Sequence, residues 1–103
     1  MRIDYTHPLS RDDVRARLRA LSEYLLNRHG IEIQWADEDN AYFKGKYMVV
    51  KIEGELTIED GVVKLRGKDP GMLWRKKAKG YLEGKLCTYL DPNTPIEELP
   101  RNK

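Results

Sequence analysis

Residues 48–58 read MVVKIEGELTI, and residues 59–65 continue with EDGVVKL. In the first stretch every even position is apolar or glycine, while the odd positions are mostly charged or polar. Because side chains alternate between the two faces of a strand, one face of this segment is predicted to be buried and the other wet. Asp60-Gly61 between the two runs is a strong signal for a two-residue hairpin turn.

This turn sets the register of two antiparallel strands. It predicts three cross-strand pairs: Ile58 with Val63, Leu56 with Leu65, and Gly54 with Gly67. The apolar faces of the two strands then agree, so the register is well specified.

A third strand is predicted to contain Ala41 and Phe43, whose side chains share one face. Gly45-Lys46 is predicted to form a type II′ turn, with glycine in the first position. This turn predicts three further pairs: Ala41 with Val50, Tyr42 with Val49, and Phe43 with Met48.

The remaining chain supplies two more strands and two helices. Residues 2–6 and 31–35 alternate as strands do, and Asp37-Glu38-Asp39-Asn40 forms an exposed acidic turn after the second. Ser10 is predicted to cap a helix that carries an apolar stripe and ends at His29-Gly30. Asp69 and Pro70 are predicted as the N-cap and first residue of the second helix.

The predicted order is strand, helix, four strands, helix. Short connections between neighbouring strands favour an antiparallel meander, and two amphipathic helices must cover its apolar face. The sequence therefore predicts an α+β fold, a two-layer sandwich with both helices on one side of the sheet. Residues 1–90 are expected to form a single domain, and residues 91–103 an extended, poorly ordered tail rich in proline.

Composition narrows the class of protein. The chain has 103 residues, of which 40% are hydrophobic and 35% charged, which is typical of a soluble globular domain. No run approaches the roughly 20 apolar residues that a membrane span needs. The single cysteine excludes an internal disulfide, so a reducing cytoplasm is expected.

The sequence shows no catalytic, cofactor-binding or metal-binding motif. His7 and His29 stand at the ends of elements, without the spacing of metal ligands. Cys87 has apolar neighbours in the second helix and is expected to be a buried thiol. We therefore expect a protein that is not an enzyme and needs no cofactor.

Two surfaces are candidates for binding. Tyr42, Tyr47 and Val49 are predicted to cluster on the outer face of the sheet, where a partner, a second copy of the chain or an apolar surface can dock. The alternative is that the tail folds over this cluster through Ile96 and Leu99. Either reading predicts an outer sheet face that is not uniformly polar.

The second surface is basic. Residues 66–85 contain seven basic residues (Lys or Arg) and only two acidic residues (Asp or Glu). Four of the basic residues lie close together on the predicted second helix: Arg75, Lys76, Lys77 and Lys79. A solvated helix face explains this count, but so does an anionic partner. Double-stranded-RNA-binding domains also place lysines at the start of a helix that follows a three-stranded meander, so nucleic-acid binding is an alternative function. A small-ligand carrier is a third class, and it needs a cavity between sheet and helices.

The order of short motifs over residues 3–90 resembles the polyhydroxyalkanoic acid system family. The motifs are Ile3-Asp4-Tyr5, His7-Pro8-Leu9-Ser10, His29-Gly30-Ile31, Trp35, Phe43, Gly54-Glu55-Leu56-Thr57-Ile58, Asp60 with Val63, and a closing basic helix. The segment between Phe43 and Gly54 is longer than in that family, and residues 70–74 (PGMLW) replace a more leucine-rich stretch.

Members of this family are small bacterial proteins associated with storage-polyester genes and granule surfaces. The resemblance implies a cytoplasmic, non-catalytic accessory protein of polyhydroxyalkanoate metabolism or granule organisation. Its partner is then another protein or the surface of the granule. The family transfers no catalytic residues to this chain.

Overall fold

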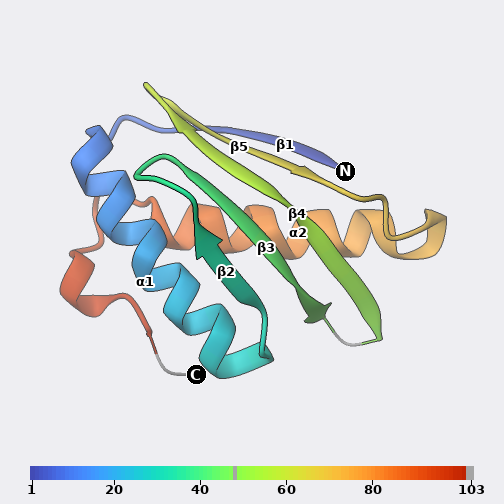
Figure 1. Cartoon of the computed structure of the whole chain (residues 1–103). Coiled ribbons are helices and arrows are strands. Elements are labelled where there is room, and N and C mark those ends of the chain that lie inside the picture. The colour runs from blue at the N-terminus through green and yellow to red at the C-terminus, as the bar shows by residue number, and fades with distance from the viewer. Residues whose placement is uncertain (48, 102–103) are drawn as a thin grey trace.

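The computed structural model describes residues 1–47 and 49–101, apart from the side chain of Tyr47. Its elements are β1 (Arg2–Thr6), α1 (Arg11–His29), β2 (Glu32–Trp35), β3 (Asn40–Tyr47), β4 (Val50–Glu59), β5 (Val62–Gly67), α2 (Met72–Tyr89) and the short 3-10 helix η1 (Ile96–Glu98). The sheet is antiparallel with the order β1-β5-β4-β3-β2, and both helices lie on one face of it (Figure 1). The predicted α+β fold and its order of elements are confirmed.

Local signals at the ends of α1 act as the sequence predicts. The Ser10 hydroxyl accepts a hydrogen bond from the backbone N–H of Asp13, and Gly30 adopts a left-handed conformation with φ of 70°. Only glycine enters this region without a steric penalty, which is why the helix ends there.

The hairpin between β4 and β5 forms in the predicted register. Ile58 pairs with Val63, Leu56 with Leu65, and Gly54 with Gly67, and Gly61 in the turn has φ of 74°. The glycine pair permits an unusually close approach. A Cβ atom at Gly54 would lie 2.4 Å from the carbonyl oxygen of Arg66, and 2.8 Å from the Phe43 ring.

The predicted turn at Gly45-Lys46 is wrong. β3 continues through both residues to Tyr47, which pairs with Val50, so the connection to β4 lies beyond Gly45-Lys46. Ala41 pairs with Leu56 rather than Val50, a slip of six residues. Because six is even, Ala41 and Phe43 still share the buried face with Ile52 and Leu56. The predicted pairs Tyr42–Val49 and Phe43–Met48 are not formed: Tyr42 lies opposite Glu55 and Phe43 opposite Gly54, and Met48 itself is outside the described residues.

Gly45 has a packing role instead of a turn role. A Cβ atom there would lie 2.8 Å from the Cα of Ile31. Glycine inside a strand commonly marks such a close backbone approach.

The second helix begins two residues later than predicted. Its N-cap is Gly71, and Met72 is the first helical residue. The Asp69 carboxylate accepts a hydrogen bond from the backbone N–H of Gly71 and pairs with Arg75. Asp69 therefore fixes the turn that leads into the helix, and does not cap the helix itself.

One apolar core lies between the sheet and the helices. Its buried residues on the helices are Val14, Leu18, Ala20, Leu21, Leu25, Leu82, Leu86 and Tyr89, and those on the strands include Ile3, Phe43, Ile52, Leu56, Ile58, Val63 and Leu65. Ala78 is the first buried residue of α2, so the beginning of this helix extends beyond the core.

The carboxyl-terminal segment packs against the helices, unlike the extended tail that its composition predicts. Leu99 is only 5% exposed and joins the core. The Tyr89 hydroxyl donates a hydrogen bond to the carbonyl of Pro100, and the Asn27 side chain donates to the carbonyl of Arg101 at 2.8 Å. Figure 1 shows this segment beside α1.

The acidic turn before β3 is part of an ion-pair network. Asp39 accepts hydrogen bonds from Arg15 at 2.8 Å and from Arg11 at 2.9 Å, and these guanidinium groups hold the pKa of Asp39 below its ordinary value. Arg11 also pairs with Asp60 in the β4–β5 turn. The network fastens the start of α1 to two turns of the sheet.

Two glycines within α2 give a simple stability prediction. A Cβ atom at Gly80 or Gly84 would meet nothing within 4 Å. We expect Gly80→Ala and Gly84→Ala each to raise the free energy of unfolding by up to about 1 kcal/mol, since alanine favours a helix interior. Urea denaturation measures the change, and a lower midpoint would contradict the open surroundings seen here.

Candidate functional site

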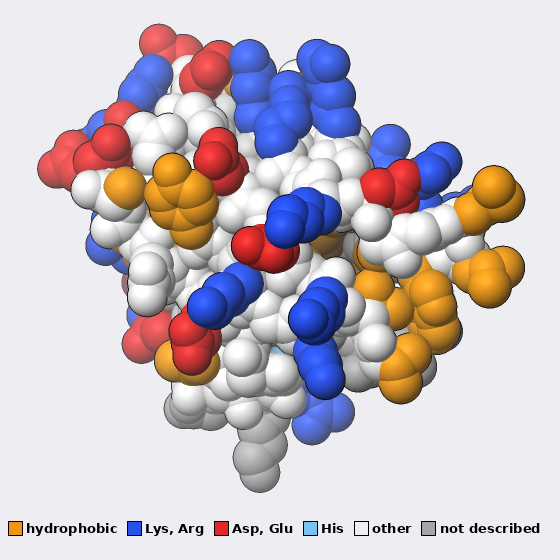
Figure 2. Space-filling model, turned by 45° about the vertical axis from the view of Figure 1, so that its right-hand side comes forward, with side chains coloured by type: hydrophobic (Ala, Val, Ile, Leu, Met, Phe, Trp, Pro, Cys, Tyr) orange, Lys and Arg blue, Asp and Glu red, His pale blue; other side chains and the backbone are white. Residues whose placement is uncertain are grey.

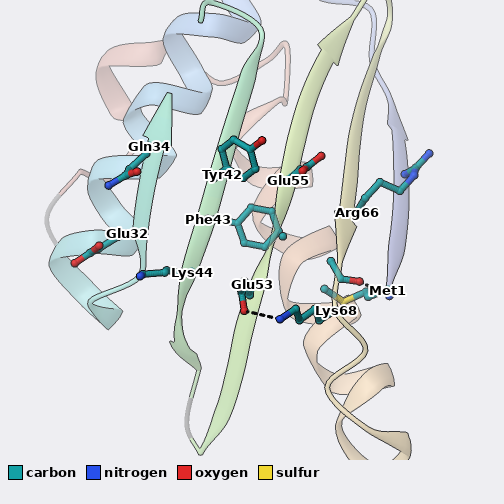
Figure 3. A pocket seen from close by; sticks show the side chains of 12 residues that line it. Met1, Glu32, Gln34, Tyr42, Phe43, Lys44, Glu53, Glu55, Arg66 and Lys68 are labelled. Carbon is teal, nitrogen blue, oxygen red and sulfur yellow. Dashed lines mark hydrogen bonds and ion pairs between the residues drawn. The ribbon is translucent and has the colours of Figure 1, made fainter. Parts of the chain in front are cut away.

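The outer face of the sheet contains an open hollow of about 660 Å³ (Figure 3). Tyr42, which is 57% exposed, lines it beside the glycine pair Gly54 and Gly67. Its other lining residues are Met1, Glu32, Gln34, Phe43, Lys44, Glu53, Glu55, Arg66 and Lys68. The polar and charged members of this lining belong to the outward-facing positions of β2 to β5 and the segment just after β5.

The charges around this hollow are balanced and partly paired. Lys68 pairs with Glu53 at 3.2 Å, and Arg66 donates to Asp4 at 2.8 Å. The Arg66 guanidinium lowers the pKa of Asp4. With three acidic and three basic side chains in its lining, the hollow has no net charge that selects a ligand. A homodimer through this face stays a prediction.

A second feature lies at one end of the molecule. Val49, in the β3–β4 turn, is 77% exposed, and Met72 and Leu73, in the first turn of α2, are 85% and 90% exposed. The half-buried Trp74 follows them. We call Val49, Met72, Leu73 and Trp74 the tip. Figure 2 shows hydrophobic side chains gathered at the right-hand edge of the molecule.

The two parts of the tip face a common hollow. Val49 from the turn and Trp74 from α2 both line an open depression of about 500 Å³. The other lining residues are Val50, Lys51, Glu53, Lys68, Asp69 and Pro70. Exposed apolar groups and lysines therefore meet in one place, although Val49 and Trp74 are 25 residues apart in the sequence.

The predicted basic patch adjoins the tip. Arg75 pairs with Asp69, and this pair lowers the pKa of the Asp69 carboxyl. The ammonium group of Lys77 lies 5.5 Å from the centre of the Trp74 ring, within the range of a cation–π contact. Lys76 and Lys79 are exposed, and within residues 1–47 and 49–101 no ion pair engages them.

The structure separates the residues that the sequence grouped on the outer face. Tyr42 lies in the sheet hollow, whereas Val49 lies at the tip, and the predicted contact between them is absent from the observed register. The side chain of Tyr47 is outside the described part of the chain. The tail does not cover Tyr42, because Leu99 packs in the core on the other side of the sheet.

Sequence reasoning missed Met72 and Leu73 as surface residues. Asp69-Pro70 predicts a helix that begins two residues earlier, and this prediction gives no sign that Met72 and Leu73 lie outside the core. The usable signal was Pro70-Gly71 followed by three apolar residues, since Gly71 with φ of 102° starts the helix late and leaves its first turn outside the core.

The histidines and the cysteine have ordinary surroundings. The Nδ1 atom of His7 accepts a hydrogen bond from the N–H of Leu9, and His29 Nε2 lies 2.7 Å from the Tyr81 hydroxyl. Burial lowers the pKa of both imidazoles. Cys87 is exposed, which contradicts the predicted buried thiol. No group of His, Cys, Asp and Glu able to hold a metal ion occurs among the described residues.

The cavity between sheet and helices is too small for a ligand. It measures about 40 Å³ and is lined almost wholly by Leu, Ile and Phe side chains from α1, α2 and the sheet. Sites for small molecules typically enclose about 300–1,000 Å³. This cavity gives no support to a small-ligand carrier.

Comparison with known proteins gives one family. A family model described as "putative polyhydroxyalkanoic acid system protein" matches residues 1–93. Searches of curated proteins and of solved structures found no match. None of the described helices is long and apolar enough to cross a membrane. Because the model covers nine-tenths of the sequence, and the motif order in the sequence indicates the same family, this chain belongs to the polyhydroxyalkanoic acid system family.

Proposed function

We propose that this protein is a non-catalytic accessory protein of polyhydroxyalkanoate metabolism that attaches to the surface of storage-polyester granules in the cytoplasm. The family supplies the metabolic context. The observation that carries the proposal is the tip, where Val49, Met72 and Leu73 are more than three-quarters exposed. Neighbouring large apolar groups that stay in water commonly mark an interaction surface.

The size of the tip indicates reversible attachment. Full burial of one such side chain yields about 1.5–3 kcal/mol. Binding costs an estimated 4–15 kcal/mol in lost translational and rotational freedom and in ordering. Three or four apolar side chains therefore give weak to moderate binding, suited to a protein that exchanges between the granule and solution.

The proposal predicts a strong dependence of granule attachment on Met72 and Leu73. We expect the double variant Met72→Ser/Leu73→Ser to lose most co-sedimentation with isolated granules, because its tip no longer gains from leaving water. The fold should persist, since both side chains lie outside the core. Quantitative blotting of the granule pellet and the supernatant measures the partition.

Leu26→Ser is the matched control for this experiment. Leu26 is 51% exposed but lies on α1, away from the tip, so its loss should leave co-sedimentation unchanged. Tyr42→Ser tests the outer sheet face in the same assay. If Tyr42→Ser abolishes attachment while the tip variant retains it, the granule contacts the sheet and the tip proposal is wrong.

Nucleic-acid binding is a second candidate, favoured only by Lys76 and Lys79, which are exposed and have no ion pair among the described residues. A mobility-shift titration with duplex RNA and DNA at two salt concentrations tests it. Binding through phosphates must weaken steeply with salt. No shift at low salt would remove this candidate.

A further inference from the structure

We propose that the tip and the lysines around it bind an anionic phospholipid surface. This inference rests on the proposed function in using the same tip, and adds the chemistry of the partner. The apolar side chains would enter the boundary between headgroups and acyl chains, and the lysines would pair with lipid phosphates.

The first argument is the shape of the apolar surface. Met72 and Leu73 stand in the first turn of a helix whose first buried residue is Ala78, so they project from the molecule. They are aliphatic and almost fully exposed. Such side chains do not need a shaped pocket in the partner, and a fluid lipid layer accepts them as it accepts the apolar face of an interfacial helix.

The second argument is an uncompensated pair of charges beside the tip. Lys46 and Lys51 lie directly opposite each other on β3 and β4, and both are exposed. Like charges in directly opposed positions destabilise a sheet. No acidic residue pairs with either lysine within residues 1–47 and 49–101. An anionic surface would relieve this repulsion, which is the charge complementarity expected of a binding face.

The third argument is the contact between the apolar and cationic parts. Val49 and Trp74 share their hollow with Lys51, and Lys77 lies over the Trp74 ring. The two acidic residues of that hollow are already paired, Glu53 with Lys68 and Asp69 with Arg75, so Lys51 keeps its charge uncompensated there. Gly71 provides no side-chain cap, and the first turn of α2 holds no acidic residue. The end of the molecule therefore presents apolar groups, lysines and helix N–H donors together.

These features favour lipid over nucleic acid as the source of phosphate. A duplex offers phosphates to the lysines but no apolar phase for Met72 and Leu73. Proteins that bind single strands stack bases on exposed aromatic rings, and Trp74 is half-buried and already under Lys77.

The experiment is co-sedimentation of the full chain with vesicles of phosphatidylcholine alone and of an equimolar mixture with phosphatidylglycerol. We expect binding to the mixed vesicles only, weakening with added salt. The variant Lys46→Gln/Lys51→Gln should weaken it on the order of 25-fold, because each lysine near an anionic membrane contributes about a fivefold change. Met72→Ser/Leu73→Ser should abolish binding to the mixed vesicles both with and without added salt.

Arg28→Gln and Leu26→Ser are matched controls, since each removes one exposed charge or apolar group from α1. Both are expected to bind the mixed vesicles as the parent chain does. Equal binding to both vesicle types would overturn the inference. So would duplex RNA that binds the chain while vesicles do not.

The granule assay separates this inference from the proposed function. Attachment to granules without binding to either vesicle type would overturn the lipid inference and leave the granule function standing. Binding to mixed vesicles without attachment to granules would support the lipid inference and overturn the granule function. Loss of both would overturn both.

Discussion

Gly54→Ala is expected to lower the free energy of unfolding by about 3 kcal/mol or more, the cost of a backbone shift in the centre of a packed sheet. The added Cβ atom would lie 2.4 Å from the Arg66 carbonyl oxygen and 2.6 Å from the Gly67 Cα. Both are backbone atoms of β5, so relief requires β4 and β5 to move apart. Chemical denaturation followed by circular dichroism measures the change.

The chain supplies its own graded controls for this effect. A Cβ atom at Gly67 would lie 3.0 Å from the Glu53 carbonyl oxygen, and at Gly80 it would meet nothing. Gly67→Ala should therefore cost less than Gly54→Ala, and Gly80→Ala should stabilise. If Gly54→Ala were as stable as the parent chain, the close approach of β4 and β5 would be wrong.

Arg17→Met is expected to lower the free energy of unfolding by about 3 kcal/mol, because it removes a buried cation and leaves its partners unpaired. Arg17 is only 5% exposed. Its guanidinium donates to Asp13 at 2.8 Å, to the Tyr89 carbonyl at 3.2 Å and to the Asp91 carbonyl at 2.9 Å. These carbonyls lie at the carboxyl end of α2, where a cation also interacts favourably with the helix dipole.

Arg28→Met is the matched control, since Arg28 is exposed on the same helix. Arg28→Met should change the free energy of unfolding by no more than about 0.5 kcal/mol, as for most surface substitutions. The Arg17 variant should also loosen the carboxyl-terminal segment, because Arg17 holds Asp91. Faster amide hydrogen exchange at residues 96–99 would show this. If exchange at these residues is the same as in the parent chain, Arg17 does not hold the carboxyl-terminal segment in place.

Sequence reasoning succeeded where the signal is local. Asp60-Gly61 determines its hairpin, and the side chains of both strands agree with the register. Ser10 and Gly30 determine the ends of α1 for the same reason, since caps depend on a few adjacent residues.

Prediction from the sequence failed where contacts with a distant part of the chain decide the role of a residue. Gly45 looked like a turn residue, but its role is to let Ile31 approach. Arg17 lies within α1, but its backbone partners are 72 and 74 residues away. Neither contact leaves a pattern in the nearby sequence.

The candidate site was predicted in parts. Val49 and the four cations of α2 were each identified from the sequence, and the structure places Val49 beside Trp74 at the start of that helix. Whether Val49 and Trp74 come together depends on how far β3, β4 and α2 extend past the core. For the two strands, the register of the β3–β4 hairpin decides this. That register was the part of the sheet predicted wrongly.

The fluorescence of Trp74 tests most directly whether the tip contacts the granule. The sequence has two tryptophans, so Trp35→Phe leaves Trp74 alone. The Trp35 indole Nε1 is buried without a hydrogen-bond partner among the described residues, so phenylalanine loses no hydrogen bond there. If the tip docks, granules should shift Trp74 emission to the blue and protect it from acrylamide. Emission and quenching that stay unchanged while the protein co-sediments would contradict contact through the tip.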